Sequence, residues 1–352
     1  MKKWLKLVLF LYLFIFSIEL IKKSLIFLEP QIGSFLTNNL SPIKAIAAGW
    51  FTTSIVQSSG AVSTLASALA GQGFLTLETA IYVLIGASLG TTITALIISF
   101  LTTTESKTDY RHGFEIALVY SIYSALLVII VLVLEGFFKL FSKSSLFLAT
   151  AISPKLSVLG VPDIIGTITS PIISILKKSI PDFTLLVLGF VILIFALKYI
   201  GKSVIAVLGG EFKAKKFIKR HFNSPIKIYV IGAILTAIVF SSSITISLLV
   251  PLAVARLINL RKAIPFILGA DLGTFTDTFL AAIIIGKPLA LATAIAYALF
   301  AVVGAIIFLP NITLLRKMTK FASKRLIKIS RRKALYILAA FIAIPLLIIL
   351  LL

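Results

Sequence analysis

The stretch FTTSIVQSSGAVSTL, residues 51–65, places a glutamine, two serines and a glycine at the centre of an apolar segment. In a membrane helix that starts near Lys44, Gln57 lies about 13 residues further on, which is roughly 20 Å of helix. The polar turn is therefore predicted near the middle of the membrane. Non-helical backbone at that depth is tolerated only where it is buried in protein or lines a watery cavity. This stretch predicts a broken helix at an internal site.

The composition of the whole chain indicates an integral membrane protein. Of its 352 residues, 59% are hydrophobic and 13% are charged, and the mean hydropathy is +1.13. Several apolar runs are close to or beyond the roughly 20 residues that a helix needs to cross the hydrocarbon core; examples are 183–200, 283–309 and 334–352. We therefore expect an all-α polytopic protein of the cell membrane.

The charged residues point to the lipid bilayer as a partner. The formal net charge is +22, but the basic residues cluster between apolar segments, where the positive-inside bias of membrane proteins places them. No nucleic-acid partner is predicted. The chain has no cysteine and two histidines, which leaves little material for a transition-metal centre. No cofactor is predicted.

The opening stretch recurs once. It aligns with ILTAIVFSSSITISL, residues 234–248, and GASLGTTIT from Gly86 aligns with GADLGTFTD from Gly269. The offset is 183 in both cases, since 241 minus 58 and 269 minus 86 give the same number. One spacing shared by two motifs predicts an internal duplication.

The duplication sets the predicted organisation. Long helices are expected at about 5–28, 77–101, 114–135, 183–208, 263–286, 288–309 and 334–352. Each repeat is predicted to hold a re-entrant helical hairpin, at 43–71 and 225–255, and a discontinuous transmembrane helix, interrupted near Ser88 to Thr91 and near Asp271. The boundaries are 1–135 for the first repeat, 136–182 for a connection without net crossing, 183–318 for the second repeat, and 319–352 for a basic cytoplasmic segment and a final transmembrane helix.

Charge also predicts the orientation. The strongest basic clusters, 213–220 and 316–333, are expected in the cytoplasm together with the N-terminus. If both hairpins return to their own side, the two halves have inverted topology. Many secondary transporters use that arrangement for alternating access to a midplane site.

The repeated motifs carry groups suited to small ions. Serine and threonine hydroxyls can hydrogen-bond an oxyanion or offer lone pairs to a small cation, and the ends of a broken helix add free N–H and C=O groups. Gly90 and Gly273 are predicted to permit the second break. Asp271 and Asp277 lie in an apolar segment, where a charge is costly and usually functional. Because carboxylates would repel an anion, a cation bound beside them predicts cation-coupled anion transport.

At these motifs the sequence resembles the type II sodium/phosphate cotransporter family, whose members carry two inverted repeats, each with a QSSS-type hairpin turn and a G-x-N-[IL]-G-T-type break. The matching stretches are VQSSGAV and GASLGTTIT, then VFSSSIT and GADLGTFTD. The resemblance implies symport of inorganic phosphate with Na+ as the coupling ion. The implied phosphate-binding residues are Ser58, Ser59, Thr91, Thr92, Ser241, Ser242, Ser243 and Thr274. The implied sodium-binding residues are Gln57, Ser88, Asp271, Thr276 and Asp277.

The chain departs from the family pattern at four positions. Gly60 replaces the last serine of the first turn and Ser88 replaces the usual Asn, while Phe240 replaces Gln and Asp271 replaces Asn in the second half. One amide is lost and one carboxylate is gained, which favours cation binding in the second repeat. The number of ions, Na+ versus H+, and the identity of the anion stay open.

Other functions were weighed against transport. Serine, threonine and glycine also pack ordinary membrane helices, but recurrence at one offset favours a binding role. A membrane-embedded phosphoryl or lipid transferase would need a general base or a metal cluster, and only Asp271 and Asp277 are available to build one. A passive channel, a scaffold and a cation-coupled transporter of another small anion are the remaining alternatives. We expect a transporter rather than an enzyme.

Overall fold

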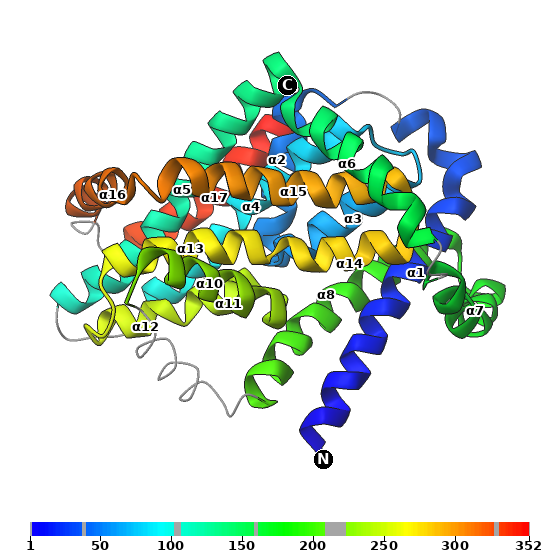
Figure 1. The fold of residues 1–352 in the computed structure, drawn as a ribbon, viewed down its shortest axis with the longest axis horizontal. Helices are drawn as coiled ribbons and strands as arrows, with labels where there is room; N and C mark the ends of the chain where they lie inside the picture. The colour runs from blue at the N-terminus through cyan, green and yellow to red at the C-terminus, as the bar shows by residue number, and fades with distance from the viewer. Residues whose placement is uncertain are drawn as a thin grey trace.

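The computed structural model describes residues 2–36, 40–101, 107–157, 161–207, 223–326 and 331–351. The regular elements of these residues are helices (Figure 1). Their bounds are α1 (Lys2–Leu36), α2 (Pro42–Val56), α3 (Ser59–Gly71), α4 (Leu77–Leu101), α5 (Lys107–Phe138), α6 (Leu140–Ser157), α7 (Val161–Ser179), α8 (Asp182–Val207), α10 (Pro225–Val239), α11 (Ser242–Ser247), α12 (Leu249–Val254), α13 (Leu260–Gly273), α14 (Phe275–Ile285), α15 (Pro288–Phe308), α16 (Ile312–Leu326) and α17 (Arg331–Leu351).

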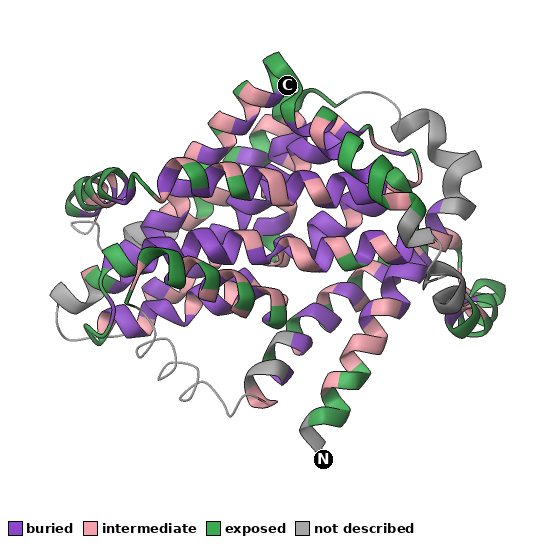
Figure 2. Cartoon of the chain, in the orientation of Figure 1, coloured by how far each residue is buried: buried purple, intermediate pink, exposed green. Residues whose placement is uncertain are grey.

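The helices form a bundle, and several of them are long and apolar enough to span a membrane. Among the described residues, six stretches have the length and hydropathy of a membrane-crossing helix: Trp4–Leu25, Leu77–Phe100, Arg111–Phe138, Asp182–Ile200, Leu260–Ile285 and Pro288–Phe308. Helices α13 and α14 follow one another end to end, and α15 runs beside them through the middle of the molecule (Figure 1). Buried residues concentrate there, whereas α7 and α16 lie at opposite ends and are largely exposed (Figure 2). The predicted all-α membrane architecture is confirmed.

Both serine turns interrupt their helices where the sequence predicts. Helix α2 ends at Val56, and Gln57 then adopts a left-handed backbone with φ 58° before α3 starts. Helix α10 ends at Val239, and Phe240 follows with φ 57° before α11. Gln57 and Phe240 are 183 positions apart, the same offset as the sequence motifs. Residues at corresponding positions therefore share an uncommon backbone conformation.

The second predicted interruption differs between the halves. Helix α4 is continuous through Ser88 to Thr91, so the expected break in this helix is wrong. The α13–α14 boundary is a single residue, Thr274, which keeps right-handed helical angles of φ −65° and ψ −25°. The threonine hydroxyls bond within their own helices instead of marking a turn, since Thr91 Oγ1 donates to the carbonyl of Ala87 and Thr274 Oγ1 to that of Ala270.

The glycines of these motifs serve close helix packing rather than a backbone turn. A Cβ on Gly86 would lie 2.0 Å from the carbonyl oxygen of Ile46 on α2, and one on Gly90 would lie 2.5 Å from that of Trp50. A Cβ on Gly269 would lie 1.9 Å from the carbonyl oxygen of Tyr229 on α10. Small residues let membrane helices approach to backbone contact. Helix α2 is thus packed tightly on α4, and α10 on α13.

Two further segments contain helices that were not predicted from the sequence. Residues 136–182, predicted as a connection without net crossing, contain α6 and α7, and each of these helices has an internal proline, Pro154 and Pro171. Helix α6 packs on α15. The basic segment before the last helix includes α16, whose last turn carries Lys324 and Arg325.

Substituting Gly86 or Gly269 by alanine should destabilise the protein, because the new methyl group would overlap a backbone carbonyl that cannot rotate away. Overpacking in a core costs typically 1–3 kcal/mol, and backbone overlap belongs at the upper end of that range. Thermal unfolding of the purified variants in detergent checks this. Gly136→Ala is the matched control, since its Cβ would meet only the Tyr82 hydroxyl at 3.9 Å. Equal unfolding temperatures for all three variants would contradict the packing role.

Candidate functional site

The two serine turns are in contact with one another. The hydroxyl of Ser243 donates a hydrogen bond to the carbonyl oxygen of Gln57 at 3.4 Å, which joins the second turn to the first. A cavity of about 520 Å³ lies against both turns. The two interruptions therefore share one polar space, as a joint binding site would require.

The walls of this cavity come from five parts of the chain. They are the turn after α2, the turn after α10, the C-terminal halves of α4 and α8, and the α11–α12 segment. The polar lining residues are Gln57, Ser58, Thr94, Lys198, Lys202, Ser241, Ser243 and Ser247.

Each turn ends in a serine that caps the following helix. Ser58 Oγ accepts a hydrogen bond from the N–H of Ala61 at 3.2 Å, and Ser241 Oγ accepts one from the N–H of Ile244 at 3.3 Å. Both serines have extended backbone and both line the cavity. An N-cap hydroxyl satisfies one N–H of the first helical turn and leaves its own proton free to donate. That proton is available to an oxyanion in the cavity.

Only part of the predicted phosphate set reaches the cavity. Ser58, Ser241 and Ser243 line it, whereas Ser59 and Ser242 are buried, each 3% exposed. Among the remaining residues of that set, the hydroxyls of Thr91 and Thr274 are bonded within their helices, and the hydroxyl of Thr92 is buried without a hydrogen-bond partner.

Asp271 is the centre of a buried hydrogen-bond network. It is 1% exposed, and its carboxylate accepts a hydrogen bond from Ser88 Oγ at 3.2 Å and from Tyr123 OH at 2.7 Å. Ser88 and Asp271 are 183 positions apart, so the two motif positions that correspond in the sequence touch one another. The predicted sodium-binding residues Ser88 and Asp271 are thus adjacent.

Asp277 forms a second buried acidic centre. Its Oδ1 accepts hydrogen bonds from the N–H and the hydroxyl of Thr278, while Oδ2 is buried without a hydrogen-bond partner. Asp277 Oδ2 lies only 1.7 Å from where a Cβ on Gly60 would be. A serine at position 60 would require this carboxylate to shift, so Gly60 makes room for Asp277.

The remaining sodium-set residues are less enclosed. Gln57 is exposed to the cavity, and Thr276 is half-buried on α14.

Three buried tyrosines lie near these acids and the serine turns, and they are not among the predicted site residues. Besides donating to Asp271, Tyr123 lies one turn from Tyr120, which interacts with Ser242, while Tyr297 interacts with Ser59. These are among the largest fully buried side chains of the described residues. The available signal was a pair of hydroxyl-bearing rings three positions apart in the mostly apolar middle of α5.

Two lysines on the cavity wall were not among the predicted site residues. Lys198 and Lys202 lie on α8, one helical turn apart, and both are exposed. Lys202 Nζ lies 5.1 Å from the ring centroid of Tyr199. The hairpin turns themselves contain no basic residue, so these side chains bring positive charge to the cavity.

Comparison with known proteins finds relatives whose names describe phosphate transport. It is 24% identical to the Sodium-dependent phosphate transport protein 2A of Rattus norvegicus and 23% identical to that of Mus musculus, over 96% of this chain and 65% of each relative. It is also 26% identical to the Sodium-dependent phosphate transport protein 2B of Homo sapiens over 36% of this chain and 19% of that protein. The chain therefore spans slightly less than two thirds of the length of the 2A relatives.

A family model settles the membership. No solved structure matches the chain significantly. The model of the Na+/Pi-cotransporter family, in contrast, matches twice, at residues 13–202 and 192–330, which together include both serine turns. The chain belongs to the Na+/Pi-cotransporter family.

Proposed function

We propose that this protein is a sodium-coupled symporter of inorganic phosphate, not an enzyme, and that the cavity between the two serine turns receives the phosphate. The hydroxyls of Ser58, Ser241 and Ser243 line that cavity, and phosphate is a strong acceptor of hydrogen bonds. The names of the relatives, which are sodium-dependent phosphate transport proteins, support the same substrates.

The observation that carries the coupling is a pair of buried carboxylates without a basic partner. Asp271 and Asp277 are each 1% exposed, and the ion pairs of the described residues involve neither of them. A buried carboxylate is strongly destabilising unless its charge is compensated. A cation bound beside each group would compensate it and would also reduce its repulsion of a nearby anion. We therefore assign Na+ to the Asp271 and Asp277 regions.

Alternating access between two inverted repeats is the mechanism that fits this site. Corresponding turns share left-handed residues, serine caps and tightly packed glycines at one offset, which supports two repeats of similar local structure. Two such repeats in opposite orientation could exchange conformations and expose the cavity to either side of the membrane. In this scheme we expect the N-terminus in the cytoplasm, on the same side as the basic clusters.

The buried predicted serines have an indirect role in this scheme. Ser59 and Ser242 contact Tyr297 and Tyr120 rather than the cavity. Together with Thr91, Thr92 and Thr274 they become phosphate ligands only if the cavity extends toward them in another state of the cycle.

Uptake of labelled phosphate into proteoliposomes tests the function. An inward sodium gradient should drive accumulation above the external concentration, because the ion gradient supplies the free energy. The control is the same vesicle with equal sodium on both sides, where phosphate should only equilibrate. Passive equilibration that ignores sodium would mean a channel, and accumulation driven by a proton gradient alone would mean a different coupling ion.

Asp271→Asn should weaken the dependence of uptake on sodium. The substitution keeps the size of the side chain but removes its charge, and losing one close charge interaction raises the half-saturating sodium concentration by roughly tenfold. Uptake measured over a range of sodium concentrations at fixed phosphate checks this. Glu78→Gln is a suitable control, because this more exposed acid pairs with Lys139 away from the cavity. Identical sodium curves for Asp271→Asn and the wild type would refute the assignment.

Gly60→Ser should destabilise the protein through its overlap with Asp277, and a second substitution, Asp277→Thr, should restore stability. Overpacking typically costs 1–3 kcal/mol, and shortening residue 277 removes the colliding atom. Unfolding temperatures of both single variants and the double variant form a cycle that measures the coupling. The rescued double variant should also show weaker cooperativity toward sodium in uptake. Additive changes in stability would show that the two side chains are independent.

A further inference from the structure

Two basic side chains line the cavity and have no role in the transport cycle proposed above. Lys198 and Lys202 line it together with Ser241 and Ser243. Residues four apart on a helix lie on the same face, so both ammonium groups can extend from α8 toward one region of the cavity. The ammonium group of Lys202 lies 5.1 Å from the ring centroid of Tyr199, three positions earlier on α8.

These lysines have no competing acidic partner in the described part of the chain. The ion pairs found there are Lys22 with Glu19, Arg111 with Glu115, and Lys139 with Glu78. A lysine that only anchors a helix at the membrane surface would extend its ammonium group outward to water. Lys198 and Lys202 also line the cavity that both serine turns border.

The positive charge of these lysines would offset the repulsion between the buried acids and an incoming anion. The buried acids contribute two negative charges near the turns when they are ionised, and the turns supply hydroxyls and helix ends but no ammonium or guanidinium group. An approaching anion would therefore meet a net repulsive field until sodium binds. A cleft that carries charge of the opposite sign concentrates an ionic ligand and speeds its association.

We propose that Lys198 and Lys202 are binding residues for the anion of the cavity, which they attract through their positive charge. This inference rests on the proposed function, because it takes phosphate as the ligand of the cavity. The hydroxyls of the turns then fix the orientation of the bound oxyanion.

The test is equilibrium binding of labelled inorganic phosphate to the purified full-length protein in detergent at saturating sodium. Lys198→Gln combined with Lys202→Gln should weaken phosphate binding by roughly tenfold. The loss should shrink as ionic strength is raised with choline chloride, because exposed charges are screened over about 10 Å at 0.1 M salt.

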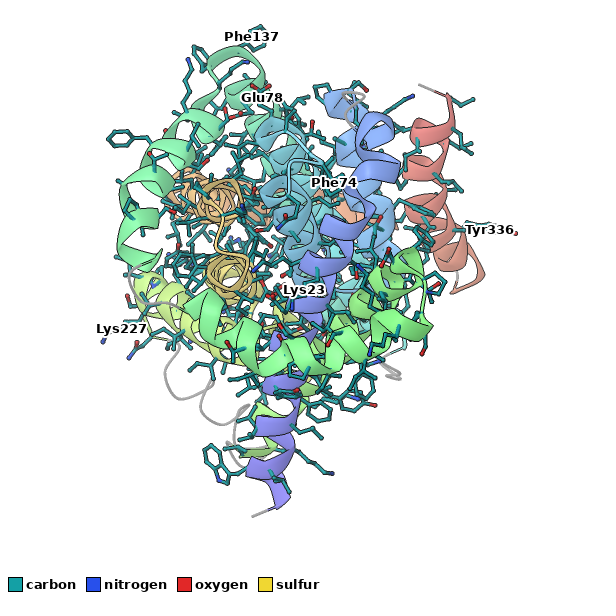
Figure 3. All side chains as sticks on the ribbon, turned by 90° about the vertical axis from the view of Figure 1, so that its right-hand side faces the viewer. Lys23, Phe74, Glu78, Phe137, Lys227 and Tyr336 are labelled. Atoms are coloured by element: carbon teal, nitrogen blue, oxygen red, sulfur yellow. The ribbon has the colours of Figure 1, made fainter. Side chains whose placement is uncertain are left out.

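The controls separate charge in the cavity from charge elsewhere. Lys198→Arg with Lys202→Arg keeps both charges and should retain most of the affinity. Lys44→Gln with Lys227→Gln removes the same net charge at two lysines that do not line the cavity, and it should leave binding unchanged. The side chain of Lys227 points outward from the bundle (Figure 3). Unfolding temperatures of all variants verify that they are folded.

The outcomes are distinct. Wild-type affinity in the Lys198→Gln/Lys202→Gln variant, or an equal loss in the Lys44→Gln/Lys227→Gln variant, would overturn the inference and leave phosphate transport intact. A loss that is the same at all salt concentrations would also overturn it, since a structural defect would behave in that way. Absence of sodium-dependent phosphate binding in the wild type would instead reject the proposed function, and this inference with it.

Discussion

The structure depends on a constraint at Gln57 and Phe240, which hold a left-handed backbone between apolar helices. That conformation costs a residue with a side chain about 1–2 kcal/mol, and it leaves the last carbonyls of one helix and the first N–H groups of the next without helical partners. In a membrane those groups must be satisfied by protein or water. The capping serines and the contact between the turns answer this requirement. The two turns are energetically costly, and their contact beside one cavity helps both to be tolerated.

The sequence predicted the helix interruptions well because their signals are local. A proline opens both α2 and α10, and a serine caps the helix after each turn, which are favoured residues at those positions. The continuity of α4 could not be read in the same way. A glycine followed by threonines suits a turn, but it equally suits a helix packed on a neighbour. Whether the segment forms a turn or a continuous helix depends on its packing against α2, whose residues lie outside the motif.

The candidate site was partly visible in the sequence for similar reasons. Asp271 stands out because a charge in an apolar helix needs an explanation. Tyr123 does not, since aromatic residues are common in membrane helices and its hydroxyl matters only because Asp271 is beside it. A lysine near the end of an apolar helix, such as Lys198, is typical of an anchor at the membrane surface. Only the position of α8 beside the turns shows that it lines the cavity. Gly60 and Asp277 were each noticed, but only the folded chain reveals that one makes room for the other.

The contact between Ser88 and Asp271 has a consequence for symmetry. If the two halves were identical copies related by a two-fold axis, this position would face its own duplicate. Two aspartates there would oppose like charges at hydrogen-bonding distance, and two serines would provide no carboxylate at all. A donor on one side and an acceptor on the other are possible only when the halves can differ in sequence. Joining both in a single polypeptide allows each half to diverge, so this central pair is one that a symmetric homodimer of either half could not form.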